Sequence, residues 1–291
     1  MSADDSRTRS GRTLKASTDS IEGVGIHTGV LARVTLHAAE PGSGVVFVSA
    51  GRRIPARAAR VSDTSRCTVL ASESGGVTVS TVEHLLSALV GLGITDALVA
   101  VDGPELPIGD GSAALWVDAV RSAGTTDTGE PVVAVALPEP LLVTGRGGAF
   151  VAAYPSDVLR LTVAISFEHP LVGTQVARFD ASRDDYGSAV APARTFGFLE
   201  EVEALRAAGL ARGGSLDNAV IVYPDRYSAP LRFGDELARH KLLDLLGDLS
   251  LGTGGAPLPT MDVVAVKPSH RLNTELAARL AEGVGASGTM A

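Results

Sequence analysis

The 291-residue sequence has a single cysteine, Cys67, and few aromatic residues, which make up 4% of the chain. One cysteine cannot form a disulfide within the chain or a zinc site built from several thiolates. A bound metal ion must therefore be held by histidines and carboxylates, and the chain has 6 histidines. The search for a metal site narrows to these positions.

Long apolar runs are also missing. The most apolar stretch, residues 131–143, is interrupted by Pro138 and Pro140, and it is shorter than the roughly 18 apolar residues that span a bilayer. The first twenty residues hold no apolar stretch that resembles a signal peptide. These absences predict a cytoplasmic protein without a membrane segment.

The charge of the chain disfavours a nucleic acid partner. The formal net charge is −8, and the basic residues form no block, whereas a phosphate backbone is bound by clustered Lys and Arg. A small substrate with an isolated anionic group remains compatible with this charge. No heptad pattern or exposed apolar stripe indicates an oligomer, so we expect a monomer.

Strand and helix periodicities are mixed along the first half of the chain. β-branched and polar residues alternate between Thr13 and Ala50, and a second strand pattern covers 97–101. The spacing of apolar residues predicts a helix over 80–90. Asp110-Gly111-Ser112 is a suitable N-cap for a further helix over 113–123.

The second half follows a similar plan after a segment of linker composition, which suggests a duplication. Its predicted strands are 132–143, 149–154, 157–166 and 261–267, and its predicted helices are 198–208, 234–247 and 271–281. The predicted division is a flexible tail at 1–11, a first domain at 12–123, a linker at 124–131 and a second domain at 132–291. The absence of strict βαβ alternation predicts an α+β fold in which each half packs a sheet against helices.

One polar stripe on an otherwise leucine-rich helix is the strongest sign of a site. His240, Asp244 and Asp248 recur every four residues and so share one helix face. A His and an Asp one turn apart can hold a divalent ion together. The alternative is an ordinary helix face with routine ion pairs, such as Lys241 with Asp244.

A second stretch, Ser80-Thr81-Val82-Glu83-His84, also has two interpretations. Ser80 and Glu83 fit a capping box, in which Glu83 bonds back to the start of the helix. Alternatively, His84 is a metal ligand and Glu83 a general base beside the metal. Neither interpretation excludes the other.

Two further positions can contribute to a hydrolytic site. His270, which follows a predicted strand, is either a solvated loop residue or a cationic acid held by Asp248. Thr195 is either an N-cap or a hydrogen-bond donor to a reacting oxygen. His27, His37 and His169 are assigned no role in the chemistry.

Seven motifs in collinear order, spanning about residues 12–280, carry a resemblance to a known family. They are GVGIHTG, STVEHLLSAL, PELPIGDGSA, ARTFGF, GLARGGSLDNAVIV, LRFGDELARHKLLDLLGDL and KPSHRLNTELAARL. In these motifs the chain resembles the UDP-3-O-acyl-N-acetylglucosamine deacetylases, hydrolases of lipid A biosynthesis. The resemblance implies two similar α+β domains whose helices lie between two sheets. It departs from the family at Pro268-Ser269, where Ser-Gly is usual.

The resemblance also implies roles for individual residues. The implied zinc ligands, with ferrous iron as an alternative ion, are His84 from the first domain and His240 and Asp244 from the second. Glu83 matches the general base. The groups that match oxyanion stabilisation are Thr195 and protonated His270, with Asp248 orienting His270, and those that match substrate contacts are Lys241 and Phe196.

The implied substrate is a nucleotide sugar that carries an acyl chain. The family accommodates this chain in an apolar passage, which the resemblance assigns to residues 166–198. Two alternatives stay open: a deacetylase for another N-acetylated sugar, and a non-catalytic homologue that binds a metal ion or an acylated sugar. The presence of Glu83 argues against the second, because a binding site needs no general base.

Overall fold

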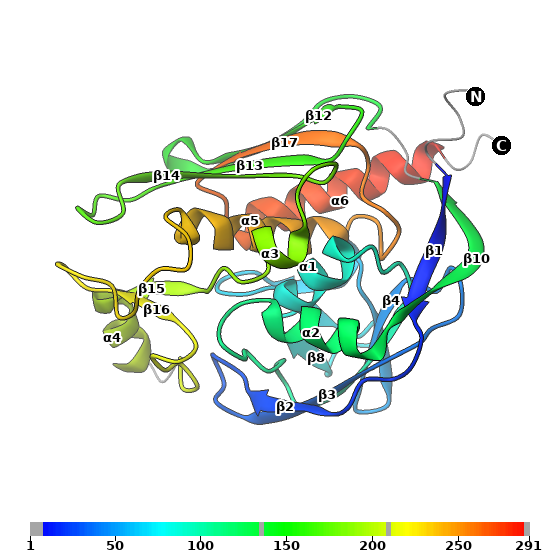
Figure 1. The fold of residues 1–291 in the computed structure, drawn as a ribbon, viewed down its shortest axis with the longest axis horizontal. Coiled ribbons are helices and arrows are strands. Elements are labelled where there is room, and N and C mark those ends of the chain that lie inside the picture. Colours follow the sequence, from blue (N-terminus) through cyan, green and yellow to red (C-terminus); the bar gives the residue numbers. More distant parts are fainter. Residues whose placement is uncertain (1–7, 134–136, 208–210, 288–291) are drawn as a thin grey trace.

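Two five-stranded sheets face each other across a layer of helices (Figure 1). The computed structural model describes residues 8–133, 137–207 and 211–287. Helices α1 (Glu83–Gly91) and α5 (Glu236–Ser250) lie in the middle of this layer and contact each other. The predicted α+β fold, with helices between two sheets, is confirmed.

The two sheets have the same strand order and the same strand directions. The first sheet contains β2 (Ile21–Val24), β3 (Leu31–His37), β9 (Ala97–Asp102), β4 (Val45–Ser49) and β5 (Arg52–Pro55), in that order. The second contains β11 (Leu141–Thr144), β12 (Phe150–Pro155), β17 (Met261–Val266), β13 (Arg160–Ser166) and β14 (Thr174–Asp180). In each sheet the third and fourth strands pair in parallel, and all other neighbouring strands pair antiparallel. This shared order supports the duplication that the sequence suggests.

The remaining elements connect the sheets and surround the helices. The other helices are α2 (Ala114–Ala123), α3 (Tyr186–Ala189), α4 (Leu199–Ala207) and α6 (His270–Ser287), and two 3₁₀ turns cover Ala58–Arg60 and Arg146–Gly148. Small sheets are formed by β6 (Val61–Asp63), β7 (Val69–Ala71) and β8 (Thr78–Ser80), and by β15 (Phe196–Phe198) with β16 (Val220–Val222). The core between the layers is apolar because alternate residues of the strands, such as Leu161 and Val163, point inward and are fully buried.

The predicted linker and part of the predicted tail form a two-stranded antiparallel ribbon instead. Strand β10 (Thr125–Val133) covers most of the predicted linker at 124–131, and it pairs antiparallel with β1 (Thr8–Leu14). Residues 8–11 of the predicted tail therefore lie in a strand, whereas residues 1–7 lie outside the described residues. Local composition missed this ribbon because its two strands are more than a hundred residues apart and pair with each other along their length. The division into two domains stays a prediction.

Several predicted strands and helices differ in detail from those in the structure. Residues 134–136 of the predicted strand at 132–143 and residue 208 of the predicted helix at 198–208 lie outside the described residues. Strand β14 was not predicted. The capping box is wrong, since Ser80 belongs to β8 and Val82 is the N-cap of α1. Glu83 is instead the first helical residue, and its carboxylate turns toward another segment.

Gly247 allows α1 and α5 to approach each other closely. A methyl group built on Gly247 would lie 2.1 Å from the backbone oxygen of Glu83 and 3.1 Å from the backbone nitrogen of Ser87. Both contacts are backbone atoms, so no side chain can rotate away to make room. The glycine therefore brings the first turn of α1 against α5, and with it Glu83 and His84.

We expect Gly247→Ala to destabilise the protein by about 1–3 kcal/mol, because overpacking a close helix contact forces the backbone to shift. Urea unfolding of both proteins measures the difference. The matched control is Gly234→Ala, where an added methyl group has nothing within 4 Å and the expected change is under about 0.5 kcal/mol. Equal stability of the two variants would contradict the close-approach argument.

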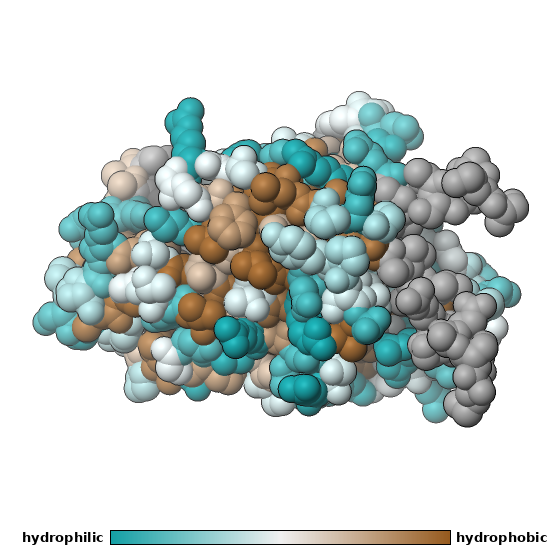
Figure 2. All heavy atoms as spheres, turned by 90° about the horizontal axis from the view of Figure 1, so that it is seen from above, coloured by the Kyte–Doolittle hydropathy of each residue, from teal (hydrophilic) through white to brown (hydrophobic). Residues whose placement is uncertain are grey.

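The outer face of the second sheet is partly apolar. Figure 2 looks onto this face and shows apolar side chains gathered in its middle. Leu142, Tyr154 and Val176 are among its large exposed side chains. Within the described part of the chain, no helix has the length and apolarity that crossing a membrane requires.

Candidate metal centre

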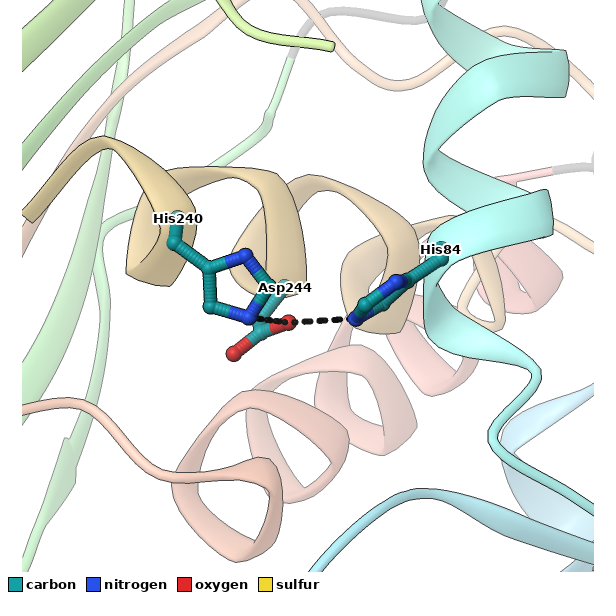
Figure 3. A group of neighbouring side chains, drawn as sticks. All are labelled: His84, His240 and Asp244. Carbon is teal, nitrogen blue, oxygen red and sulfur yellow. Dashed lines mark ion pairs between the residues drawn. The ribbon is translucent and has the colours of Figure 1, made fainter. Parts of the chain in front are cut away.

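Three side chains from α1 and α5 converge in the helical layer (Figure 3). One ligand atom from each of His84, His240 and Asp244 lies within 4.8 Å of the others. The Oδ1 atom of Asp244 is 3.7 Å from Nε2 of His84 and 3.4 Å from Nε2 of His240. All three side chains are buried. The structure therefore brings together the two histidines and the carboxylate that the resemblance implies.

The chemistry of these donor atoms fits a divalent metal ion. Oδ1 of Asp244 is buried and has no hydrogen-bond partner among the residues that the structure describes. Leaving a buried carboxylate oxygen unpaired is costly, and this one faces the two imidazole nitrogens. A cation between the three atoms removes that cost. The other oxygen, Oδ2, accepts a hydrogen bond of 2.9 Å from Nζ of Lys241.

The protonation of both histidines suits metal binding. Nδ1 of His240 lies 3.1 Å from the carbonyl oxygen of Ala193, so this nitrogen carries the proton and Nε2 keeps its lone pair free. Burial, and next the neighbouring His240, lowers the pKa of His84 to about 3. Burial also lowers the pKa of His240. Neutral imidazole is the form that coordinates metal ions.

Glu83 lies directly beside this group. Its Oε2 accepts a hydrogen bond of 3.1 Å from the backbone N–H of Thr68, and its Oε1 lies 3.8 Å from Nε2 of His270. Burial raises the pKa of Glu83 to about 8, against the opposing effect of His270 and with further contributions from Asp248 and Asp244. A bound cation would act in the opposite direction. Such a carboxylate can accept and release a proton near neutral pH.

His270 and Asp248 form a buried pair. Nδ1 of His270 is 3.0 Å from Oδ2 of Asp248, and the ring therefore presents Nε2 toward Glu83. Burial lowers the pKa of His270, but Asp248 and Glu83 outweigh it and raise the pKa to about 9. This pKa favours the positively charged form of the imidazole, and the contact with Asp248 fixes the orientation of the ring. Pro268 and Ser269 do not prevent this placement, because His270 begins α6.

The other predicted site residues lie around the same group. Thr195 precedes β15 and is not an N-cap, since α4 begins at Leu199. Its backbone N–H donates to Gly111 and its carbonyl accepts from Val220, each at 2.8 Å. Nζ of Lys241 lies 5.9 Å from the ring centre of Phe196.

A cavity of about 520 Å³ opens onto these residues. Its wall includes the predicted site residues Glu83, His84, Thr195, Phe196, His240, Lys241, Asp244 and His270. The apolar part of the wall is formed by Ile26, Ile108, Phe196, Leu199, Val202, Ala211, Leu216, Ala219 and Ile221. Most of this apolar wall comes from residues 196–223 and not from the predicted 166–198. Phe196 connects this wall to α5, since its ring lies 6.4 Å from the ring of His240. His27, to which no role was assigned, also lines the cavity.

Three buried residues of the site were not found by sequence reasoning. Thr68 donates hydrogen bonds to Glu83 and Asp248, and Nδ2 of Asn273 donates to Oδ2 of Asp248 at 3.0 Å. Glu105 accepts hydrogen bonds from the turn that contains His27. Asn273 lies three residues after His270 on one helix, a spacing that could have revealed it. The isolated Thr68 carries no such signal.

Glu236 fixes the segment that surrounds His240. The carboxylate is fully buried and accepts from Nε of Arg194 at 2.7 Å and from the backbone N–H groups of Arg194 and Arg232. Burial raises its pKa, but the hydrogen bonds with Arg194 and Arg232 outweigh this and lower it below its ordinary value of 4.5. Glu236 thereby holds the 193–196 segment against α5.

We expect Glu236→Gln to destabilise the protein by about 3 kcal/mol at pH 7, because it leaves the guanidinium of Arg194 with an uncharged partner. Because the pKa of Glu236 is lowered in the folded protein, its charge contributes fully to the free energy of unfolding above pH 4.5. This contribution falls as the pH drops through the lower pKa of the folded state. Urea unfolding at pH 7 and at lower pH should therefore show that the difference in free energy of unfolding between wild type and variant decreases as the pH falls. A gap that does not change with pH would contradict this account.

Two histidines and a carboxylate converge on a common point, and a buried glutamate lies beside them. This is the arrangement that hydrolases with a three-ligand metal site use. The family model described as UDP-3-O-acyl N-acetylglycosamine deacetylase matches residues 11–282. The chain belongs to this family, and it is therefore a deacetylase, an enzyme that hydrolyses an amide bond.

Individual relatives agree with this assignment. The chain is 39% identical to the UDP-3-O-acyl-N-acetylglucosamine deacetylase of Synechocystis sp., over 94% of this chain and 99% of the relative. It is 43% identical to the enzyme of the same name from Thermosynechococcus vestitus, over 93% of this chain and 94% of the relative. For the Myxococcus xanthus enzyme the identity is 42%, over 88% of this chain and 82% of the relative.

Proposed function

We propose that the chain hydrolyses the acetamide of UDP-3-O-acyl-N-acetylglucosamine with the help of a zinc ion held by His84, His240 and Asp244, a reaction of lipid A biosynthesis. The observation that carries the proposal is the unpaired, buried Oδ1 of Asp244 between two Nε2 atoms, next to a buried glutamate. Two nitrogens and one oxygen are the donor set of many catalytic zinc sites, and ferrous iron is the alternative ion.

An ion held by His84, His240 and Asp244 would supply Lewis acidity for the water and for the amide carbonyl. Glu83 acts as the general base. Its Oε2 is held by the N–H of Thr68, which leaves Oε1 to take the proton from the attacking water. Burial near other carboxylates keeps the proton affinity of Glu83 high enough for this transfer.

His270 and Thr195 stabilise the negative charge that develops on the carbonyl oxygen. The protonated ring of His270 is oriented by Asp248 through the 3.0 Å contact at Nδ1, and Nε2 provides an N–H for the oxyanion. The hydroxyl of Thr195 supplies a second donor from the cavity wall. Nε2 of His270 lies only 3.8 Å from Oε1 of Glu83, so both proton carriers can reach the departing amine.

The cavity supports a substrate with an acyl chain. Its apolar wall includes residues of β15, α4 and β16 and the exposed Leu216. Lys241 and Phe196 also line the cavity and suit contacts with the sugar. The cytoplasmic location and the monomeric state stay predictions.

The test is acetate release from UDP-3-O-acyl-N-acetylglucosamine, with UDP-N-acetylglucosamine as the control substrate that lacks the acyl chain. Zinc-loaded protein is compared with chelated protein and with chelated protein after zinc is restored. Release that requires both zinc and the acyl chain supports the proposal. Equal release from both substrates would indicate another N-acetylated sugar, and zinc binding without any release would indicate a binding protein.

A further inference from the structure

Thr68 lies fully buried just before β7, and all three of its polar groups make contacts within the site. Its N–H donates to Oε2 of Glu83 at 3.1 Å, and its carbonyl accepts from the N–H of Val82 at 3.4 Å. Its hydroxyl donates to Oδ1 of Asp248 at 2.5 Å. One residue thus contacts the start of α1 with its backbone and α5 with its side chain.

The hydroxyl completes the set of donors around Asp248. Oδ1 of this carboxylate receives the hydroxyl of Thr68, while Oδ2 receives Nδ1 of His270 and Nδ2 of Asn273, both at 3.0 Å. Donors on both oxygens define the plane of the carboxylate. Because that plane sets the direction of the bond to Nδ1, it also sets where Nε2 of His270 points. The hydroxyl oxygen itself lies 3.4 Å from Nδ1.

We infer that Thr68 is a positioning residue that aligns the two proton carriers of the reaction. Its N–H fixes Glu83, and its hydroxyl fixes His270 through Asp248. The inference rests on the proposed function, because it takes Glu83 and His270 as the groups that move protons. A threonine that only fills space would be replaced by the equally shaped valine without a specific effect on turnover.

The first experiment compares Thr68→Val, Thr68→Ser and a matched control, Thr95→Val. Thr95 is also buried, and its hydroxyl donates to a carboxylate, Oδ2 of Asp96 at 2.6 Å, outside the catalytic group. We expect Thr68→Val to lower kcat about 10- to 100-fold with KM changed less than about threefold. Thr68→Ser, which keeps the hydroxyl, should return kcat to within about threefold of wild type, and Thr95→Val should leave it unchanged. An unchanged kcat in Thr68→Val overturns the inference.

A double variant shows whether Thr68 acts through His270. In the His270→Gln background, Thr68→Val should lower kcat by less than about threefold, because the group that the hydroxyl positions is already gone. A full, independent loss in that background would show that Thr68 acts by another route and would overturn the inference.

A readout without turnover separates this inference from the proposed function. The Nδ1 proton of His270 gives a downfield ¹H resonance, which is assigned by its loss in His270→Gln. It should shift in Thr68→Val and stay in place in Thr95→Val. A shift in a protein that releases no acetate would refute the proposed function but keep the contact, whereas no shift in an active enzyme would refute the role of Thr68 alone.

Discussion

Glu83→Gln lowers kcat by a factor of about 10²–10⁴ while the protein keeps its zinc and its fold. The factor is the usual contribution of a general base. The substituted side chain retains an oxygen that accepts the Thr68 N–H bond seen for Glu83, so the first turn of α1 stays in place. The amide cannot take a proton from water, however, and the loss falls on kcat. Acetate release at saturating substrate, together with zinc content and thermal unfolding, measures these effects.

The matched control is Glu200→Gln, the same substitution on an exposed residue of α4. It should retain wild-type kcat. If Glu83→Gln kept more than about a tenth of the activity with full zinc content, another group would have to be the base.

Asp244→Ala removes the metal-dependent part of the stability as well as the activity. For wild type, zinc at one hundred times its dissociation constant adds about 2.7 kcal/mol to the free energy of unfolding. This corresponds to a rise in Tm of roughly 4 °C for a chain of this size. Without the carboxylate, only His84 and His240 remain as ligands, and we expect the zinc-dependent rise to disappear.

Thermal unfolding of both proteins with zinc and with a chelator measures this difference directly. Asp118→Ala truncates an exposed carboxylate on α2. Its Tm should rise with zinc as much as that of wild type. A zinc-dependent rise that persists in Asp244→Ala would mean that the ion binds elsewhere. The chelated variant also loses the hydrogen bond that Oδ2 accepts from Lys241, so the quantity compared is the rise in Tm that zinc adds to each protein and not the stability of the chelated proteins.

The parts of the site that sequence reasoning predicted share one property, which is local spacing. His240, Asp244 and Asp248 lie one helical turn apart, and the structure places all three on the buried face of α5. The α+β class and most helices follow from periodicity in the same way. That His84 faces Asp244 does not follow from spacing, and it was expected only because of the resemblance.

The features that were missed depend on contacts between distant segments. Thr68 meets Asp248 across 180 positions of the chain, and no pattern around either residue reveals the other. The same holds for the ribbon of β1 and β10, whose strands resemble a tail and a linker when taken alone. The capping box predicted for Glu83 was wrong for a related reason. Its expected partner, Ser80, is in a strand, and its actual partner is Thr68.

The division of the proposed ligands between the two halves has a consequence during synthesis. His84 emerges from the ribosome with the first sheet, but His240, Asp244 and His270 follow more than a hundred and fifty residues later. The first half alone offers one histidine of the group and no complete site, so we expect this half to fold without the ion. We therefore expect the ion to bind at this position only after α5 has been synthesised, late in translation or after it.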